Sequence, residues 1–325
     1  MSIAGGVALE LAGRHLLDVA ELDGAQLELV MRTTEEARRQ VTERQVPAPL
    51  TGRRVALLFV EPSTRTRTSF EIAARNLGAE VLSLDAGSSS LVKGESIADT
   101  ARTLDALGID FLVMRHGQSG APWLAAQCFS GHVLNAGDGW HAHPTQALLD
   151  LFTLRRALGA DGLRGRKMVI VGDVLHSRVC RSNLWTLTAA GMDVWLCGPP
   201  ALLSGFAEWA AQMPVDRRFR VTDDLAAALD DADVVMALRI QRERMADAQL
   251  TTLDEYVARF QVNAARLRLA RPGVLFMHPG PVNEGIEVSI EVARGPRSLV
   301  TEQVANGVFT RMAVLSLLAE TDAHR

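Results

Sequence analysis

The segment Ser63-Thr64-Arg65-Thr66-Arg67-Thr68 places hydroxyl and guanidinium groups directly after an expected strand. Residues Val55–Val60 form an apolar run, and Pro62 ends the hydrogen-bond ladder that this run predicts. The segment then leads, as a turn, into a helix expected from Ser69. A helix start offers unpaired backbone N–H groups and the positive end of the helix dipole, so the added hydroxyls and arginines are suited to surround a phosphate dianion. The alternative is a helix start capped by one hydroxyl, with both arginines in water.

A second polar segment, Gly137-Asp138-Gly139-Trp140-His141-Ala142-His143-Pro144-Thr145-Gln146, leads into a strongly amphipathic helix. Pro144 fits the first turn of that helix. His143 and Gln146 are three residues apart across the helix start, so both side chains are expected to face one site. His141 and His143 alone do not predict a metal site, because no third ligand lies nearby in the sequence. We therefore expect no metal and no other cofactor.

Lysine is rare in this chain: the 34 basic residues include it only at Lys93 and Lys167. Lys93 lies in a polar, glycine-containing loop, Ser88-Ser89-Ser90-Leu91-Val92-Lys93-Gly94-Glu95-Ser96. Its retention there favours a specific need for an ammonium group. The composition of the loop by itself is typical of solvated surface.

Basic residues also follow three of the expected strands. They are Arg115 with His116 after Phe111–Met114, Arg178 beyond the loop after Met168–Val171, and Arg239 after Val234–Leu238. Ligands of open α/β sheets gather at the carboxyl ends of strands, so this pattern predicts an anionic ligand. The segment Met277-His278-Pro279-Gly280-Pro281-Val282-Asn283 follows a further strand, and its prolines are expected to present backbone groups rigidly.

The positions of these residues require an α/β fold in which short buried strands alternate with helices. The expected strands are Val55–Val60, Glu80–Leu84, Phe111–Met114, His132–Asn135, Met168–Val171, Asp193–Cys197, Val234–Leu238 and Val274–Met277. The expected helices are Ser69–Leu77, Ile97–Leu107, Thr145–Leu158, Val179–Ala190, Asp224–Leu229 and Glu302–Leu318. We predict two βαβ domains of similar size with parallel central sheets, joined by helices. Residues 1–145, joined by the last helix at about 300–325, form the first domain, and residues 146–299 form the second.

Composition excludes several classes of protein. A length of 325 residues is natural for two domains, and a formal net charge of −4 gives no reason to expect nucleic acid. No apolar run approaches the ~18–20 residues of a membrane span, and the first residues lack the layout of a secretory signal, so a cytoplasmic protein is expected. Cys128, Cys180 and Cys197 are scattered and are expected to be buried thiols.

Taken together, these motifs resemble, in order and over nearly the whole chain, the catalytic chains of the aspartate carbamoyltransferase family. The matching segments include Phe59-Val60-Glu61-Pro62-Ser63-Thr64-Arg65-Thr66-Arg67, Lys93-Gly94-Glu95, Val113-Met114-Arg115-His116, His143-Pro144-Thr145-Gln146, His176-Ser177-Arg178, Arg239-Ile240-Gln241 and His278-Pro279-Gly280-Pro281. Ornithine carbamoyltransferases share part of the first and fourth segments. They carry a histidine-cysteine-leucine-proline segment where this chain has His278-Pro279-Gly280-Pro281, which separates the two activities.

The resemblance implies a role for each matching residue. Ser63, Thr64, Arg65 and Thr66 would hold the phosphate of carbamoyl phosphate, Arg115 and His143 would reach its carbonyl oxygen, and Gln146 with the backbone at Gly280 and Pro281 would bind its amino group. Arg178, Arg239 and Gln241 would bind the carboxylates of L-aspartate. Lys93, with a serine such as Ser90, would come from a neighbouring subunit, because the family forms homotrimers with shared sites. Regulatory or dihydroorotase chains are further partners that the resemblance allows.

The chemistry implied is transfer of a carbamoyl group to an amine, as an early step of pyrimidine biosynthesis. Thr66, Arg115 and His143 would stabilise a developing oxyanion, while Arg65 and Lys93 would offset charge on the phosphate. No serine or cysteine lies in a nucleophile–base pattern, so the amine is expected to attack directly and to give its proton to the leaving phosphate.

Three alternatives remain at this point. One is a carbamoyltransferase for another amine, such as ornithine, and another is a non-catalytic scaffold subunit with degraded motifs. The third, an oxidoreductase with a nucleotide cofactor, lacks a GxGxxG segment after any expected strand.

Overall fold

The computed structural model describes residues 15–85, 94–240 and 252–323. The chain divides into two compact units, Met1–Leu148 with Asn306–Arg325 (unit 1) and Leu149–Ala305 (unit 2). Helices α5 (Pro144–Leu158) and α13 (Val300–Ala323) each contribute residues to both units. The assignment of one substrate to each predicted domain, 1–145 with about 300–325 and 146–299, stays a prediction.

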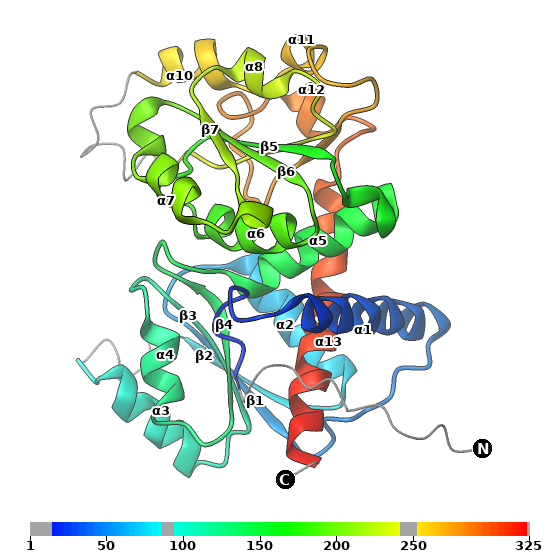
Figure 1. Ribbon diagram of the computed structural model, residues 1–325. Coiled ribbons are helices and arrows are strands. Elements are labelled where there is room, and N and C mark those ends of the chain that lie inside the picture. The colour runs from blue at the N-terminus through cyan, green and yellow to red at the C-terminus, as the bar shows by residue number, and fades with distance from the viewer. Residues whose placement is uncertain (1–14, 86–93, 241–251, 324–325) are drawn as a thin grey trace. The chain divides into compact units, whose positions relative to one another are not determined.

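Unit 1 contains a parallel four-stranded sheet in the order β2-β1-β3-β4 (Figure 1). Its elements are α1 (Gly24–Glu43), β1 (Arg54–Phe59), α2 (Thr64–Asn76), β2 (Glu80–Asp85), α3 (Ile97–Ala106), β3 (Phe111–His116), α4 (Ala121–Ala126) and β4 (His132–Asp138). Strand β4 is buried along its whole length, as in parallel sheets covered by helices. Helices α3 and α4 pack against one face of the sheet, where Leu104 and Ala125 join a core cluster with Leu58, Leu112 and Val133.

Unit 2 contains a parallel five-stranded sheet in the order β7-β6-β5-β8-β9. Its strands are β5 (Lys167–Val171), β6 (Asp193–Cys197), β7 (Arg220–Thr222), β8 (Val234–Ala237) and β9 (Leu275–Met277). Its helices are α6 (Arg178–Ala189), α7 (Phe206–Gln212), α8 (Leu225–Leu229), α10 (Leu253–Phe260), α11 (Ala264–Leu267) and α12 (Ile290–Ala293). Val171, Val235 and Phe276 form one core cluster with Leu229 of α8 and Phe260 of α10.

The predicted fold class is confirmed, and most predicted strands lie within one residue of the observed ones. Strands β3 and β4 run on to His116 and Asp138, so Arg115 lies inside its strand instead of after it. Helix α1 was not predicted, although Asp23 and Gln26 form a capping box that marks its start. Helices α4, α7, α10, α11 and α12 and strand β7 were also missed, and all of them are short.

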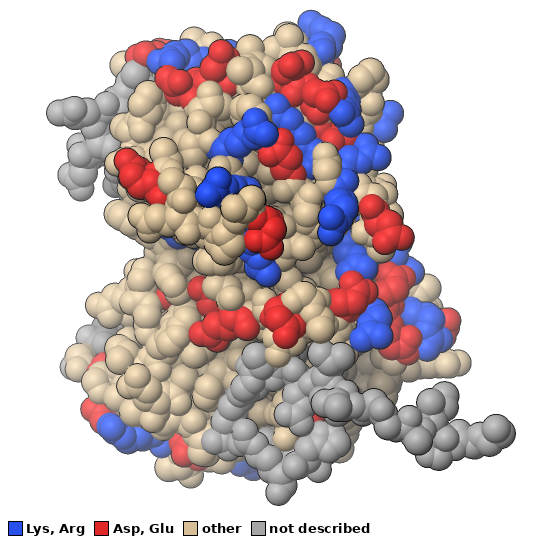
Figure 2. Space-filling view, in the orientation of Figure 1, with Lys and Arg blue, Asp and Glu red and all other residues tan. Residues whose placement is uncertain are grey.

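Two further observations concern the surface. Among the described residues, no helix has both the length and the apolar character that a membrane crossing needs. Basic and acidic side chains are interspersed over the face shown in Figure 2, as the near balance of 34 basic and 38 acidic residues would suggest.

Candidate functional site

The start of helix α2 differs from the sequence-based expectation. The helix begins at Thr64 and not at Ser69, so the predicted turn is the first turn of the helix. The prediction was wrong because hydroxyl residues are neutral to unfavourable within a helix, so their run was interpreted as a turn before the helix. The first-turn N–H groups therefore belong to Thr64, Arg65 and Thr66 themselves.

Ser63 is the residue before this helix, in an extended conformation with φ −161° and ψ 97°, and its side chain makes no capping hydrogen bond. By contrast, Asp23, Ser96 and Ser177 cap α1, α3 and α6 through their side chains. The alternative of a helix start capped by this hydroxyl is therefore wrong. The first-turn amides of α2 are not occupied by the side chain at the N-cap.

The side chains of this turn differ in exposure. Thr64 and Arg65 are exposed, while Thr66 is buried. The side chain of Arg65 forms no ion pair or hydrogen bond with any residue in the described parts of the chain. Ser69 turns its hydroxyl back on the helix, donating to the carbonyl oxygens of Arg65 at 2.7 Å and Thr66 at 3.0 Å. The arrangement presents one exposed guanidinium beside a helix N-terminus, which is suited to an anion.

Arg115 is positioned by the end of the same sheet. Its carbonyl oxygen accepts a hydrogen bond from Val60 N at 2.9 Å, which ties the ends of β1 and β3 together. Its half-buried side chain lies 3.6 Å from Glu61 (Nε to Oε2) and donates from Nη1 to Ala136 O at 3.4 Å. A carboxylate and a backbone carbonyl thus hold the guanidinium at the carboxyl edge of the sheet.

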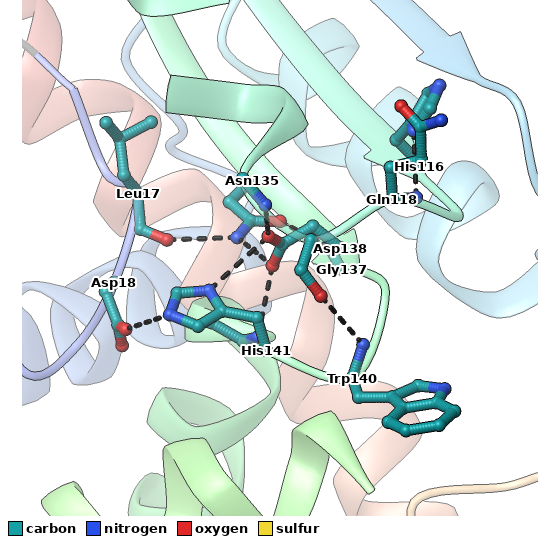
Figure 3. A network of polar contacts seen from close by, with 12 residues as sticks. Leu17, Asp18, His116, Gln118, Asn135, Gly137, Asp138, Trp140 and His141 are labelled. Atoms are coloured by element: carbon teal, nitrogen blue, oxygen red, sulfur yellow. Dashed lines mark hydrogen bonds and ion pairs between the residues drawn. The ribbon is translucent and has the colours of Figure 1, made fainter. Parts of the chain in front are cut away.

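Asp138 organises the second predicted segment (Figure 3). Its Oδ1 accepts hydrogen bonds from Asn135 Nδ2 at 2.8 Å and Ala142 N at 3.1 Å, and its Oδ2 accepts one from Gly120 N at 2.7 Å. The ring of His141 lies between two carboxylates, 3.4 Å from Asp138 and 3.5 Å from Asp18. These contacts fix the loop that leads into α5.

The charges of this network respond to burial. Burial tends to raise the pKa of Asp138, but the hydrogen bonds from His141, Asn135 and Gly120 outweigh it and lower that pKa. Burial raises the pKa of Asp18, against the hydrogen bond from Ala20 N and the charge of His141. Asp138 is therefore a stable anion whose hydrogen-bond donors are built into the loop.

His143 and Gln146 follow this loop at the start of α5, where Gln146 N donates to His143 O at 3.0 Å. Both side chains are buried, with 4% and 8% of their surfaces exposed. The expected helix start between the two residues is confirmed, because α5 begins at Pro144. That both side chains face one site stays a prediction. Among the described residues, no three His, Cys, Asp or Glu side chains are arranged to hold a metal ion.

A groove of about 490 Å³ lies beside the Asp138 network, lined by residues that include Asp18, Glu21, Trp123 and His141. None of the site residues predicted from the sequence lines it. The groove is open to solvent, whereas small-molecule sites are usually concave and largely enclosed, so it does not mark the candidate site.

Arg178 of unit 2 is the first residue of α6, which Ser177 caps by accepting a hydrogen bond from Cys180 N at 3.1 Å. The loop before it is held by Asp173, whose Oδ1 contacts His176 Nδ1 at 2.8 Å. Gly172 has φ 129°, and a Cβ there would lie 2.8 Å from Leu238 O. Only glycine therefore lets the end of β5 approach the end of β8 so closely.

Arg239 follows β8 at the same edge of the sheet, because β5 and β8 pair in parallel with Val171 opposite Ala237. Its side chain is half-buried, and its Nε is shielded from solvent without a hydrogen bond to any described residue. Arg178 and Arg239 therefore both come from the carboxyl edge of one sheet, as the sequence predicted.

The segment after β9, residues 278–283, presents backbone groups, as the sequence led us to expect. Gly280 N donates to His278 Nδ1 at 2.8 Å, and the Gly280–Pro281 peptide bond is cis. A trans peptide unit points its N–H and C=O in opposite directions, so the carbonyl of Pro279 is directed away from the imidazole. Pro281 has no N–H. This segment consequently offers acceptors to a ligand more readily than donors.

Two of the predicted site residues, Lys93 and Gln241, lie outside the described residues, as does Ser90.

Two family models cover almost the whole chain. Residues 14–156 match the carbamoyl-P binding domain of aspartate/ornithine carbamoyltransferases, and residues 164–318 match their Asp/Orn binding domain.

The chain belongs to the aspartate/ornithine carbamoyltransferase family.

Among members of this family, the chain is 49% identical to the aspartate carbamoyltransferase catalytic subunit of Roseiflexus sp. (strain RS-1), over 94% of this chain and 95% of that one. It is 50% identical to the corresponding subunit of Chloroflexus aurantiacus (strain ATCC 29366 / DSM 635 / J-10-fl), over 94% of this chain and 98% of that one.

Solved carbamoyltransferase structures share the fold. Aspartate transcarbamoylase from Trypanosoma cruzi, in complex with N-(phosphonacetyl)-L-aspartic acid, has a TM-score of 0.81 at 31% identity, covering 94% of this chain and 96% of that one. Ornithine carbamoyltransferase from Pyrococcus furiosus has a TM-score of 0.84 at 30% identity, covering 95% and 98%. Both kinds of carbamoyltransferase match equally well in backbone, so the fold alone does not separate the two amine substrates.

Proposed function

We propose that this chain transfers the carbamoyl group of carbamoyl phosphate to the amine of L-aspartate, giving N-carbamoyl-L-aspartate and phosphate. The observation that carries the proposal is the 49–50% identity, over 94% of the chain, to subunits named aspartate carbamoyltransferase. The segment His278-Pro279-Gly280-Pro281 supports aspartate over ornithine. The matched residues are present without degradation, which disfavours a non-catalytic scaffold.

Unit 1 would bind carbamoyl phosphate. The uncapped first turn of α2, with Ser63, Thr64 and Thr66 and the exposed Arg65, supports binding of its phosphate. Arg115 and His143 would donate to the carbonyl oxygen as negative charge develops there, together with Thr66.

The amino group of carbamoyl phosphate needs hydrogen-bond acceptors. Gln146 supplies a side-chain carbonyl oxygen. Gly280 and Pro281 supply backbone carbonyl oxygens, while the N–H of Gly280 already donates to His278. Because this segment offers hydrogen-bond acceptors more readily than donors, it is suited to bind the amino group of carbamoyl phosphate.

Unit 2 would bind L-aspartate. Arg178 and Arg239 lie at one edge of its sheet, and two guanidinium groups match an amino acid with two carboxylates better than one with a cationic tail. Gln241 would complete this set.

The reaction follows from these roles. The neutral amine of aspartate forms a bond to the carbonyl carbon, and the carbonyl π electrons move to oxygen, where Arg115 and His143 donate. The intermediate then breaks its bond to the phosphate oxygen, which leaves with the electron pair and takes the amine proton. No covalent intermediate on the protein is needed, and much of the acceleration would come from holding both substrates in place.

We further propose a homotrimer in which Lys93 of one chain serves the site of its neighbour, and a role early in pyrimidine biosynthesis. Mass in solution tests the assembly: three times the 35.2 kDa of one chain is expected. A monomer with full activity would contradict the shared site.

The activity itself is tested by assaying carbamoyl-phosphate-dependent product formation with L-aspartate and, separately, with L-ornithine. Product is expected with aspartate and not with ornithine. The reverse result would overturn the proposal, as would the absence of product with both amino acids.

A further inference from the structure

Unit 2 contains a fully buried pair that none of the proposed roles uses. His278 Nε2 lies 3.3 Å from Glu287 Oε1, and both side chains have 0% of their surface exposed. Burying a carboxylate is costly, and an apolar pair of similar volume is often as stable. The pair therefore calls for a role other than stability.

The hydrogen bonds of His278 assign its tautomer. Nδ1 accepts a hydrogen bond from Gly280 N at 2.8 Å, so Nδ1 carries no proton in the neutral ring. The ring proton then lies on Nε2, the atom that faces Glu287. Nε2 forms no hydrogen bond with a described residue, so its contact with Glu287 at 3.3 Å is electrostatic. The imidazole thus lies between the buried carboxylate and the backbone of the segment proposed to bind the carbamoyl amino group.

Glu287 also holds the other end of that segment. Its Oε1 accepts a hydrogen bond from Asn283 N at 2.5 Å. Asn283 in turn donates from Nδ2 to Ile240 O at 3.3 Å, next to Arg239. One carboxylate oxygen therefore contacts both ends of residues 278–283 and, through Asn283, reaches the chain that carries Arg239.

The backbone of Glu287 is itself fixed. Val262 N donates to Glu287 O at 2.9 Å, and Ser289 N donates to Val262 O at 3.0 Å. The negative charge of Glu287 also contributes, after burial, to raising the pKa of the Tyr256 hydroxyl. The chain at Glu287 is thus tied to Val262 through the backbone, and its carboxylate is fully buried inside the unit.

A second buried chain of hydrogen bonds begins at the backbone N–H of His278. His278 N donates to Gln303 Oε1 at 3.0 Å, and Gln303 Nε2 donates to Asp150 Oδ1 at 2.7 Å. The other oxygen of Asp150 accepts from Asn183 Nδ2 at 2.8 Å. Asn183 belongs to α6, the helix that begins with Arg178. The segment after β9 is consequently linked to the elements that carry both arginines.

We propose that Glu287 is a positioning residue for the substrate-binding segments of unit 2, acting through His278 on Gly280 and through Asn283 on the chain beside Arg239. It does not touch substrate. The expected effect of Glu287 on kinetics rests on the proposed function. Its expected effect on the structure of residues 278–283 does not depend on the reaction.

Glu287→Gln tests this role, because it keeps the shape and one acceptor oxygen but removes the charge. The control is Asp233→Asn, which removes a buried carboxylate of the same unit that pairs with Arg166 at 2.7 Å and Arg271 at 3.2 Å. Asp233 precedes β8, at the opposite end of the strand from Arg239. Both variants are expected to lower the unfolding temperature.

Only Glu287→Gln is expected to lower kcat/KM for L-aspartate, by about 10- to 100-fold, because small displacements of binding groups are costly. The inhibition constant of inorganic phosphate should not change, since phosphate binding is assigned to α2. Hydrogen exchange should become faster in residues 278–284 in Glu287→Gln and remain as in the parent chain in Asp233→Asn.

Parent-like kcat/KM and exchange in Glu287→Gln would overturn the inference, as would an equal kinetic loss in Asp233→Asn. If Glu287→Gln does not fold, Asn283→Ala replaces it: a several-fold rise in KM for aspartate supports the role, and an unchanged KM contradicts it. A parent chain that forms no N-carbamoyl-L-aspartate would refute the proposed function, while the exchange comparison would still decide the positioning role.

Discussion

In unit 1 the buried carboxylate of Asp138 divides its donors between both oxygens, whereas in unit 2 Glu287 Oε1 accepts a hydrogen bond from Asn283 N and lies 3.3 Å from His278 Nε2, which forms no hydrogen bond with a described residue. Within the described residues, Glu287 Oε2 has no hydrogen-bond partner. Asp138 is therefore well compensated by neighbouring dipoles, and Glu287 is not. Loss of the Asp138 carboxylate should mainly lower the free energy of unfolding. Loss of the Glu287 carboxylate should mainly displace the substrate-binding segments of unit 2.

The two units also differ in how they present positive charge. In unit 1, Arg65 is exposed at the start of α2, which has no side-chain cap. In unit 2, Arg178 and Arg239 are half-buried, and the helix that begins at Arg178 is capped by Ser177. The first arrangement suits a small dianion that brings its own acceptors to backbone amides, and the second suits carboxylates of a larger molecule.

The largest effect is expected at the start of α2. Arg65→Ala should lower kcat/KM by about 100- to 1,000-fold or more, because the leaving phosphate loses a charged donor. Steady-state kinetics with both substrates measure this loss. Arg75→Ala, on the same helix but paired with Glu71 at 3.0 Å, is the matched control and should leave the kinetics unchanged. Equal activity in Arg65→Ala and the parent chain would exclude the assigned role.

Asp138→Asn should have an intermediate effect, on stability. The variant should lose about 2 kcal/mol of unfolding free energy at neutral pH, as is typical of hydrogen bonds to a charged group. Urea unfolding of the parent and the variant measures the difference.

The pH dependence of this difference has a definite sign. Because the folded state lowers the pKa of Asp138, the stabilisation is present above the unfolded pKa of about 3.9 and is lost as pH falls through the folded pKa. The gap between the two proteins should therefore close below about pH 4, as the Asp138 carboxylate is protonated. A gap that does not narrow below that pH would contradict the assigned charge state.

The smallest effect concerns the thiols. Burial raises the pKa of Cys180 and of Cys197 to about 12, whereas Cys128 of unit 1 is partly exposed. Iodoacetamide at pH 8 should modify Cys128 alone, without loss of activity, and should reach the unit 2 cysteines only in denaturant. Mass spectrometry of digested protein identifies the sites. Rapid labelling of Cys180 in native protein would mean that unit 2 opens readily.

Local patterns in the sequence were enough to predict much of the fold. Continuous apolar runs such as Met168–Val171 predicted buried parallel strands. A strand that is buried on both faces has apolar residues at successive positions and does not alternate with polar ones. The end of α2 was predicted well because Gly78 stops it, but its start was not, because hydroxyl residues are compatible with either a turn or a first helical turn.

The residue types of the candidate site were also readable from the chain. A hydroxyl- and arginine-rich helix start after a strand and arginines at strand ends are chemical signals that need no tertiary information. Their match to a family over nearly the whole length gave the proposed substrates.

Only the tertiary structure revealed the supporting carboxylates. Glu287 lies among other acidic residues, Glu284 and Glu291, and nothing in that stretch marks which of them is buried. Its contacts with His278 and Asn283 depend on how β9 and the chain after it fold back on one another. The sequence thus determined which groups can bind the substrates, through residue type and local spacing. The fold decided which buried charges hold those groups in place, because burial depends on packing between segments distant in the chain.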